Sequence, residues 1–530
     1  MHGRLKVRTS AEEAARKKKE QELKVKAYRA GMAKIQSKRS KNELDEEMLT
    51  ISGQILARNP DVYTLWNIRK ECILKLSEKL DEEAKQAVFD KDLGFAEQCL
   101  LANPKSYGAW HHRCWILENC PKPNMDREVA LCNKYLKLDE RNFHTWDYRR
   151  FVVGKAGIEP TKELDFCTEK IRNNFSNYSS WHYRSNLLPI IHPHETDPLR
   201  PISEEKLKEE LEMVLTAAFT DPNDSSAWFY QRWLLGYSRP ELDIAAFRIN
   251  RKQAVIAFTK PITSSDFKIQ ITPPLQVFSE WKPANGSSAD STWFIEGDFT
   301  ISEKETCKPV LCTLEGKYCA LDLKRCHDGF FGIKCPRFEY EFGAAVIDEL
   351  KNQLDSCEQL LELEPDSKWT LLTTALLMRA IDRSKLHEKS IEYLTKLQTI
   401  DSMRKGYYED LASKWNTEKC LEEWQTSKKI PNEISLKNLN LTSIYYDQYF
   451  SIADVIDLSD NCLSNRSIPK LSSFRFAKKI SMESNKLSAI ENIPNLKYLS
   501  ELSLKDNKDL REHGDSSVDA ICGEGFKINI

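Results

Sequence analysis

The sequence lacks the features that mark membrane and secreted proteins. No apolar run reaches the roughly 18–20 residues that a membrane-spanning helix needs. The N-terminus is polar and lysine-rich, unlike the apolar core of a signal peptide. The C-terminal stretch Lys527–Ile530 has no cysteine that could carry a lipid anchor. We therefore expect a cytoplasmic protein that does not insert directly into membranes.

An excess of either charge is also missing. The 530-residue chain has 78 Lys and Arg residues against 80 Asp and Glu residues, a net charge of -2. Bulk binding to nucleic acid would need a basic field, so we expect no nucleic-acid partner. With 41% hydrophobic and 30% charged residues, the composition is typical of a soluble globular protein. Its length predicts several domains, because one core rarely grows past roughly 250–300 residues.

Pairs of cysteines at metal-binding spacing are absent as well. No Cys-x-x-Cys pair occurs among the 15 cysteines, so we interpret them mostly as free thiols. Five of them gather beside His327: Cys307, Cys312, Cys319, Cys326 and Cys335. Their spacings fit no common zinc-binding pattern, so a zinc site there is the less favoured interpretation.

What the sequence does contain is a repeat, a tryptophan followed three residues later by an arginine. The copies are Trp66 with Arg69, Trp110 with Arg113, Trp146 with Arg149, and Trp181 with Arg184. A fifth copy, Trp228 with Arg232, is one residue longer, and a weaker sixth at Trp369 lacks the arginine. The first five tryptophans are 44, 36, 35 and 47 residues apart. Such periods indicate stacked helical hairpins, that is, an α-solenoid.

A helix-breaking dipeptide precedes most of these tryptophans. The dipeptides are Asn59-Pro60, Asn103-Pro104, Asp221-Pro222 and Glu364-Pro365. Because proline cannot continue a helix and restrains the residue before it, each repeat is a helix, a turn and a helix. We expect the tryptophan to fill the core between hairpins. We expect the arginine, one turn later on the same face, to bond carbonyls or acids of a neighbouring hairpin.

A different residue pattern follows the first helical region. Residues from about 252 to 341 contain short strands with β-branched and aromatic residues, which favour a β-sandwich inserted into the solenoid. The predicted strands are Val255–Phe258, Phe267–Ile271, Thr292–Ile295 and Phe338–Phe342. The helical pattern resumes near Ala345.

The last hundred residues carry a second repeat. Its copies are Ile434–Leu441, Ile456–Leu463, Ile480–Leu487 and Leu502–Asn507. This is the leucine-rich pattern, in which a short strand leads to an asparagine that bonds the turning backbone. The first copy has Leu439 in place of the asparagine, and we expect about four copies before the pattern ends in Ser516–Ile530.

Tandem hairpins with Trp-x-x-Arg resemble the alpha subunits of protein prenyltransferases. The segment Asn103–Arg113 is similar to the second repeat of that family, and Asp139–Trp146 is similar to the third. Within the family, the β insert and the leucine-rich tail resemble the animal Rab geranylgeranyltransferase branch. So do the opening Met1–Val7 and the segment Phe175–Ser185.

The resemblance implies a mainly α fold, a right-handed α-α superhelix with two appended modules. The helical hairpins would occupy residues 1–238 and 346–430. An Ig-like β-sandwich would occupy residues 239–345, and leucine-rich repeats would occupy residues 431–530.

The same resemblance implies a reaction and its partners. The family member transfers geranylgeranyl from geranylgeranyl diphosphate to C-terminal cysteines of Rab GTPases. It works as a heterodimer with a beta subunit, which holds the zinc and the isoprenoid pocket, and it is inactive alone. A Rab escort protein presents the substrate.

Four residues of the second and third hairpins are the candidate site that the resemblance implies. Diphosphate is the leaving group, so positive charge and hydrogen-bond donors near it lower the barrier. The resemblance places Lys105 and Tyr107 against the diphosphate, and Asn142 and His144 near the same cavity. The alternative is that these are solvated or packed turn residues.

Three further histidines are weaker candidates. His111 and His112 are adjacent on a helix, so at most one can face a site, and packing is the favoured interpretation. His2 could reach a partner's zinc, although an unstructured tail is the favoured interpretation.

Two other functions remain open from the sequence. The chain could be the alpha subunit shared by farnesyltransferase and type I geranylgeranyltransferase, although the β insert and the leucine-rich tail oppose this. It could also be a non-enzymatic helical-repeat scaffold that binds peptides. The irregular spacing of 35–47 residues and the Trp-x-x-Arg motif favour the prenyltransferase.

Overall fold

The protein is described by a computed structural model. The described residues are 11–197, 200–236, 242–271, 280–299, 301, 310–314, 317–334, 338, 341–427, 430–489, 493–510 and 527–529. The chain divides into two compact units, Met1–Ile191 and His192–Ile530.

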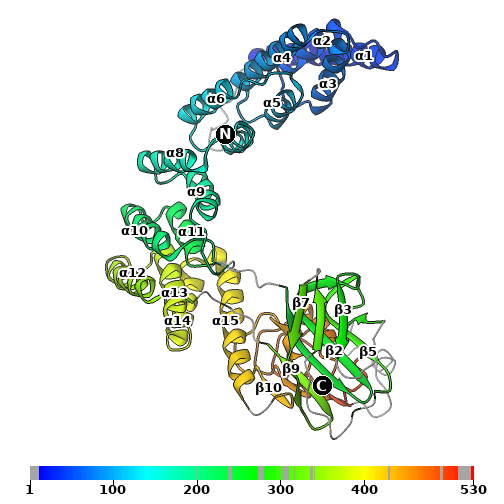
Figure 1. Cartoon of the computed structure of the whole chain (residues 1–530), viewed down its shortest axis with the longest axis vertical. Coiled ribbons are helices and arrows are strands. Elements are labelled where there is room, and N and C mark those ends of the chain that lie inside the picture. The colour runs from blue at the N-terminus through cyan, green and yellow to red at the C-terminus, as the bar shows by residue number, and fades with distance from the viewer. Residues whose placement is uncertain are drawn as a thin grey trace. The chain divides into compact units, whose positions relative to one another are not determined.

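The first unit consists of helices that pack in consecutive pairs (Figure 1). They are α1 (Ala11–Ser40), α2 (Glu46–Leu56), α3 (Tyr63–Ser77), α4 (Glu82–Ala102), α5 (Tyr107–Asn119), α6 (Met125–Leu138), α7 (Phe143–Ala156), α8 (Pro160–Asn173) and α9 (Tyr178–Ile191). The pairs α2–α3, α4–α5, α6–α7 and α8–α9 are the predicted hairpins, and the predicted turns separate their helices.

Capping residues begin and end these helices where the sequence changes. Asp81 and Asn124 cap the starts of α4 and α6, and Ser106 and Asn142 cap the starts of α5 and α7. Each side chain accepts a hydrogen bond from a backbone N–H that the helix leaves free. Gly157 ends α7 at a φ of 64°, a left-handed conformation that glycine adopts without a steric cost.

The second unit contains further helices, which precede and follow a sheet region in the sequence. Its helices are α10 (Glu204–Thr220), α11 (Ser225–Leu234), α12 (Ala344–Leu363), α13 (Lys368–Asp382), α14 (His387–Ile400), η1 (Ser402–Arg404) and α15 (Lys405–Thr426). Helix α10 packs against α11 and α12, and α11 packs against α13. Helices separated by the sheets therefore lie side by side, as expected for an insertion.

Two antiparallel sheets form the inserted region. Their strands are β1 (Ile244–Asn250), β2 (Gln253–Thr263), β3 (Phe267–Ile271), β4 (Lys282–Pro283), β5 (Ala289–Glu296), β6 (Val310–Leu314), β7 (Lys317–Leu321), β8 (Lys324–Arg325) and β9 (Gly329–Ile333). One sheet has the order β4-β5-β2-β1-β9-β8 and the other β3-β6-β7. Three of the predicted strands are confirmed in β2, β3 and β5.

The fourth predicted strand, Phe338–Phe342, is wrong. Phe338, Glu341 and Phe342 are not in a strand, and the last strand among the described residues of the insert ends at Ile333. The Phe338 ring instead packs against Tyr446, with ring centroids 5.2 Å apart. The aromatic ring of Phe338 therefore packs against a segment that is distant in the sequence and does not form part of a sheet.

A parallel sheet follows α15. Its elements are β10 (Glu433–Ser435), α16 (Asp447–Phe450), β11 (Val455–Asp457), η2 (Asn465–Ser473), β12 (Lys479–Ser481), β13 (Glu501–Ser503) and β14 (Lys527–Asn529). Asn461 donates to the carbonyls of Leu436 and Leu458 and accepts from the backbone N–H of Leu441. Asn485 and Asn507 bond the backbone in the same way, so their predicted role is confirmed. The sequence did not reveal β14.

The inserted sheets and the parallel sheet share part of one core. Ala245, Ala246 and Phe331 of the insert belong to the same buried cluster as residues of β10–β13 and Trp424 of α15. Arg248 is fully buried on β1 and donates to the carbonyl of Ile452, across 204 residues of sequence. The insert and the parallel sheet therefore share buried surface, which the sequence did not predict.

Candidate functional site

The interior of the helical pairs is built from the repeated tryptophans. Each indole is buried, and its Nε1 donates to the backbone oxygen six residues earlier, at 2.7 to 3.1 Å. These pairs are Trp66 with Pro60, Trp110 with Pro104, Trp146 with Glu140, Trp181 with Phe175, and Trp228 with Pro222. The predicted core position of the tryptophan is confirmed, and its bond to the turn that precedes its own helix is a finding of the structure.

The repeated arginines are buried in ion pairs with the next hairpin. Arg113 donates from Nε and Nη2 to Glu128, and Arg149 donates from the same two nitrogens to Glu163. A charged side chain loses its hydration on burial, and this costs free energy unless an opposite charge pairs with it. The predicted structural role of the arginine is confirmed.

The fifth repeat departs from the expected pairing. The sequence motif assigns Arg232 to this repeat, but Gln231 occupies the position three residues after Trp228 and is fully buried. The Gln231 amide donates to Gln353 of α12 at 2.7 Å. Arg232 lies over the ring of Tyr407. A neutral amide pair therefore replaces the ion pair here, and the one-residue shift in the motif reflects this replacement.

The turns at one end of the hairpins bring the four predicted site residues together. Lys105 lies in the α4–α5 turn with its side chain 67% exposed, and its Nζ is 3.9 Å from Asp139 Oδ2. Tyr107 begins α5 and is 57% exposed. Within the described residues, its hydroxyl makes no hydrogen bond. A cation and a phenol are thus presented to solvent two residues apart.

The residues of the third hairpin lie directly beside this pair. The His144 ring meets the Tyr107 ring edge-on, with centroids 4.2 Å apart. Burial lowers the pKa of His144, and the charge of Lys105 acts in the same direction. A neutral imidazole is therefore favoured beside the tyrosine.

Asn142 joins the two turns. It is only 2% exposed, its amide donates to the carbonyl of Pro104 at 3.0 Å, and its Oδ1 accepts from the His144 N–H. Ser106 and Asn177 make the same kind of bond, to the carbonyls of Pro60 and Glu140. The side chain of Asn142 thus fixes the spacing between Lys105 and His144.

One residue of this cluster was missed by the sequence reasoning. Phe143 is half-exposed and its ring lies 4.0 Å from that of His144 and 6.2 Å from that of Tyr107, between centroids. The position three residues before each of the first four repeat tryptophans is aromatic in every case: Tyr63, Tyr107, Phe143 and Tyr178. That regularity was available in the sequence and would have found it.

Of the other histidine candidates, His111 and His112 differ in burial, and His2 is not among the described residues. His112 is fully buried against Asp92, whereas the neighbouring His111 is exposed and lies 3.5 Å from Lys70 Nζ. Burial lowers the pKa of His112. His2 lies outside the described residues.

Within its described residues, the cysteine-rich stretch has one cluster of metal-ligand type. Cys326, His327 and Asp328 bring their ligand atoms within 4.8 Å of one another. Arg248 donates to both oxygens of Asp328, and Lys478 Nζ lies 3.5 Å from His327. Two cations at this distance oppose a divalent ion. Cys307 and Cys335 lie outside the described residues.

The described helices include none that is long and apolar enough to cross a membrane.

The repeated helical pair is recognisable among known proteins. The family described as "Protein prenyltransferase alpha subunit repeat" matches residues 89–120, 125–156, 160–190 and 207–238. Each match spans one hairpin, from α4–α5 to α10–α11. The helical part of the chain is therefore of the prenyltransferase alpha-subunit class.

Curated relatives match nearly the whole chain. Geranylgeranyl transferase type-2 subunit alpha of Sus scrofa is 39% identical over 96% of this chain and 92% of the relative. The Homo sapiens protein of the same name is 38% identical over the same shares. The Dictyostelium discoideum protein of that name is 30% identical over 78% of this chain and its own full length. The chain belongs to the family of geranylgeranyl transferase type-2 alpha subunits.

Proposed function

We propose that this chain is the alpha subunit of a heterodimeric enzyme that geranylgeranylates Rab GTPases. The observation that carries the proposal is the similarity to type-2 alpha subunits along 96% of the chain. The partners we propose are a beta subunit, a Rab escort protein that presents the substrate, and the Rab itself. We propose that the heterodimer works in the cytoplasm and that this chain alone is inactive.

In the proposed reaction, a cysteine sulfur of the Rab tail attacks C1 of geranylgeranyl diphosphate. The new C–S bond forms as the C1–O bond breaks, and the departing electron pair stays on the diphosphate. Zinc held by the beta subunit would supply the cysteine as a thiolate.

The four turn residues are proposed to act on the leaving group. The Lys105 ammonium and the Tyr107 hydroxyl are the exposed donors, and both suit an anion that gains charge as the bond breaks. His144 supports the tyrosine ring from its edge, and Asn142 holds the two turns in register. Tyr107 and Lys105 would contact the diphosphate, and Asn142 and His144 would position them.

The finer architecture is part of the same proposal. We propose that the helical pairs of residues 1–238 and 346–430 form a right-handed superhelix, that residues 239–345 form an Ig-like sandwich, and that residues 431–530 are leucine-rich repeats. The parallel sheet with its asparagine-bonded turns supports the last of these assignments.

The test is reconstitution with purified components. The chain, the beta subunit, an escort protein and a Rab are combined with labelled geranylgeranyl diphosphate, and label in the Rab is counted. We expect transfer only when both subunits are present, and loss of transfer on zinc chelation. Formation of the heterodimer without transfer to any Rab would favour the scaffold function. Transfer by the chain alone would overturn the division of labour between subunits.

A further inference from the structure

The joint between the first two hairpins, where α3 packs against α4 and α5, differs from the next two joints in one residue. In those joints an arginine of one hairpin pairs with a glutamate of the next hairpin, and a tyrosine of that next hairpin bonds the same glutamate. The two sets are Arg113, Glu128 and Tyr148, and Arg149, Glu163 and Tyr183. The first joint consists of Arg69 of α3, Asp92 of α4 and His112 of α5. Histidine therefore replaces tyrosine there, two residues after the repeated tryptophan.

Protonation of His112 is unfavourable while the first joint is closed. The side chain is fully buried, and its Nε2 donates to Asp92. Within the described residues, the buried Nδ1 has no hydrogen-bond partner. A second proton would make Nδ1 a donor without an acceptor, and would set His112 and Arg69, two buried cations, against the one carboxylate of Asp92. Both consequences cost free energy in a buried site.

The charged groups that act on His112 lie on two other helices. Burial lowers the pKa of His112, and the charges of Arg69 and Lys70 on α3 act in the same direction. Asp92 on α4 opposes them through its hydrogen bond and its charge. Burial opposes ionisation of Asp92, but its bonds with His112 and Arg69 hold the pKa of its carboxyl below the usual range. Mild acid can therefore change the charge of His112 while Asp92 stays ionised.

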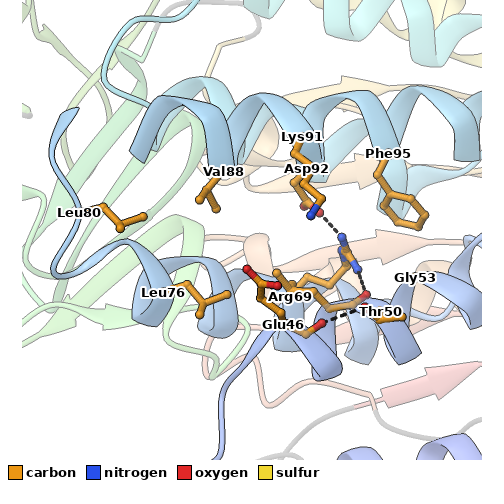
Figure 2. Close-up of a pocket in the computed structure, with 11 residues that line it drawn as sticks. Glu46, Thr50, Gly53, Arg69, Leu76, Leu80, Val88, Lys91, Asp92 and Phe95 are labelled. Carbon is orange, nitrogen blue, oxygen red and sulfur yellow. Dashed lines mark hydrogen bonds and ion pairs between the residues drawn. The ribbon is translucent and has the colours of Figure 1, made fainter. Parts of the chain in front are cut away.

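A cavity of about 450 Å³ lies beside the pair of Arg69 and Asp92, between α2, α3 and α4 (Figure 2). Both residues are among those that line it, and Figure 2 shows Arg69 reaching from α3 toward Asp92. Leu76 and Val88 line the same cavity from α3 and α4. Close packing resists the displacement of side chains, and open space of this size removes part of that resistance.

We infer that the first joint is an acid-sensitive hinge, in which protonation of His112 weakens the pair of Arg69 and Asp92 and lets α3 and α4 separate at the cavity. The next two joints lack this response, because burial raises the pKa of Tyr148 and of Tyr183 and neither hydroxyl titrates in mild acid. None of the four turn residues takes part, so the hinge does not depend on the proposed reaction.

The pH range of the hinge follows from proton linkage. In the open joint, His112 regains its hydration and its ordinary pKa of about 6.5. Below that pH the open form binds a proton that the closed form does not bind, so acid favours opening by up to about tenfold per pH unit. The effect is absent well above that pH, and it levels off below the lowered pKa of His112 in the closed joint.

Buried cysteines can report the opening of individual joints. Cys72 and Cys99 are fully buried near Arg69 and Asp92, whereas Cys167 is fully buried near Glu163 of a later joint. The full-length chain is treated with dithiodipyridine, a disulfide that thiols attack, and each modified cysteine is quantified by mass spectrometry. The ratio of Cys72 or Cys99 to Cys167 cancels the pH dependence that all thiols share. We expect this ratio to rise by up to about tenfold between about pH 7.5 and about pH 5.5.

The decisive variant is His112→Gln, because the glutamine amide can donate to Asp92 and does not titrate. It should remove the rise in the ratio. The matched control is His111→Gln, which changes the exposed neighbouring histidine and should keep the rise. If His112→Gln does not fold, nitrogen-15 NMR of the histidines in the unmodified chain decides, since His112 should stay neutral in the folded chain at about pH 6.5.

Three results would overturn the inference. One is a ratio that does not change with pH, which would mean that acid does not open the first joint selectively. Another is the same rise in folded His112→Gln, which would assign the response to a different group. The third is a protonated His112 in the folded chain at about pH 6.5, which would mean that the closed joint accepts the second proton.

Discussion

The interior of the helical pairs and the turns at their ends use repetition differently. In the interior, each tryptophan bonds the carbonyl six residues earlier and the arginines bond buried acids. At the turns, some positions repeat and others do not. The repeated positions hold the scaffold together, so the unrepeated ones are where a specific function is expected.

The four site residues divide along this line. Asn142 matches Ser106 and Asn177, which bond a preceding turn in the same way. Tyr107 also stands at a position that is aromatic in its neighbours. Lys105 and His144 do not repeat: their counterparts are Asp61, Arg141 and Ser176 for the lysine, and Thr64, Gly108 and Ser179 for the histidine. Of the four, these two carry the strongest indication of a specific role.

The largest effect is expected in the interior. Trp146→Ala should lower the free energy of unfolding by roughly 3–5 kcal/mol, because it empties a buried core position and removes the bond to Glu140. Chemical denaturation of the heterodimer measures it. The control is Tyr63→Ala at an exposed turn position, which should change the free energy by less than about 0.5 kcal/mol. Similar losses for the two variants would erase the distinction between interior and turn.

The next largest effect concerns Lys105 at an unrepeated turn position. Lys105→Ala should lower turnover by about 10- to 150-fold, the worth of a charge-assisted contact of roughly 1.5–3 kcal/mol. Heterodimer assembly and melting temperature should not change, because the side chain is mostly exposed.

Arg141 provides the matched control for Lys105. It occupies the same position one repeat later and bonds Ser176. Arg141→Ala should leave turnover near that of the unmodified protein. Equal losses for the two variants would indicate a general effect of turn charge and would argue against a specific contact at Lys105.

A smaller effect should separate Asn142 from its repeat counterpart. Asn142→Ala and Asn177→Ala each remove a hydrogen bond to the preceding turn, and Asn142→Ala also removes a helix cap, so each should cost about 0.5–2 kcal/mol of stability. Only Asn142→Ala should also lower turnover, because only that turn adjoins Lys105. Steady-state rates and melting curves on both variants give the comparison. Equal turnover in the two would assign Asn142 to the scaffold alone.

The sequence predicted what local spacing controls. The Trp-x-x-Arg motif and the Asn-Pro turns gave the hairpins, because the residues that form each hairpin are close together along the chain. The partners of Gln231 and Arg248 could not be predicted, since they lie 122 and 204 residues away. The misassigned Arg232 and the wrong strand at Phe338–Phe342 have the same cause, namely residue types explained by distant contacts.

The candidate site followed from the sequence only in part. The resemblance named Lys105, Tyr107, Asn142 and His144, and the structure places them on adjacent turns. Which of them are exposed and which are engaged depends on how one hairpin stacks on the next. That stacking is set by side-chain packing, which local pattern does not encode.

The smallest effect on turnover is expected from removing both appended modules. None of the four proposed site residues lies in residues 239–345 or 431–530, and the Dictyostelium relative is matched in full by 78% of this chain. Replacing the first segment by a short linker and deleting the second should leave turnover within about tenfold, or near 1.4 kcal/mol in barrier. Steady-state rates of the full-length and doubly trimmed heterodimers measure this.

The shared core dictates how this last experiment must be made. Deleting residues 431–530 alone would remove Asp454 and the Ile452 carbonyl from the buried Arg248, and would uncover Ala246 and Phe331. Arg248 would keep Asp328 as its partner, but the uncovered apolar surface favours association between molecules, so we expect this single deletion to aggregate. Removing both modules eliminates Arg248 together with its partners. It leaves chiefly Leu421 and Trp424 of α15 uncovered, and replacing these two residues by glutamine can keep the trimmed protein soluble. If the soluble, doubly trimmed heterodimer lost more than about 100-fold in turnover, a module would have to contribute to the reaction. The contrast between a repeated scaffold and unrepeated turn residues would then be insufficient to locate the site.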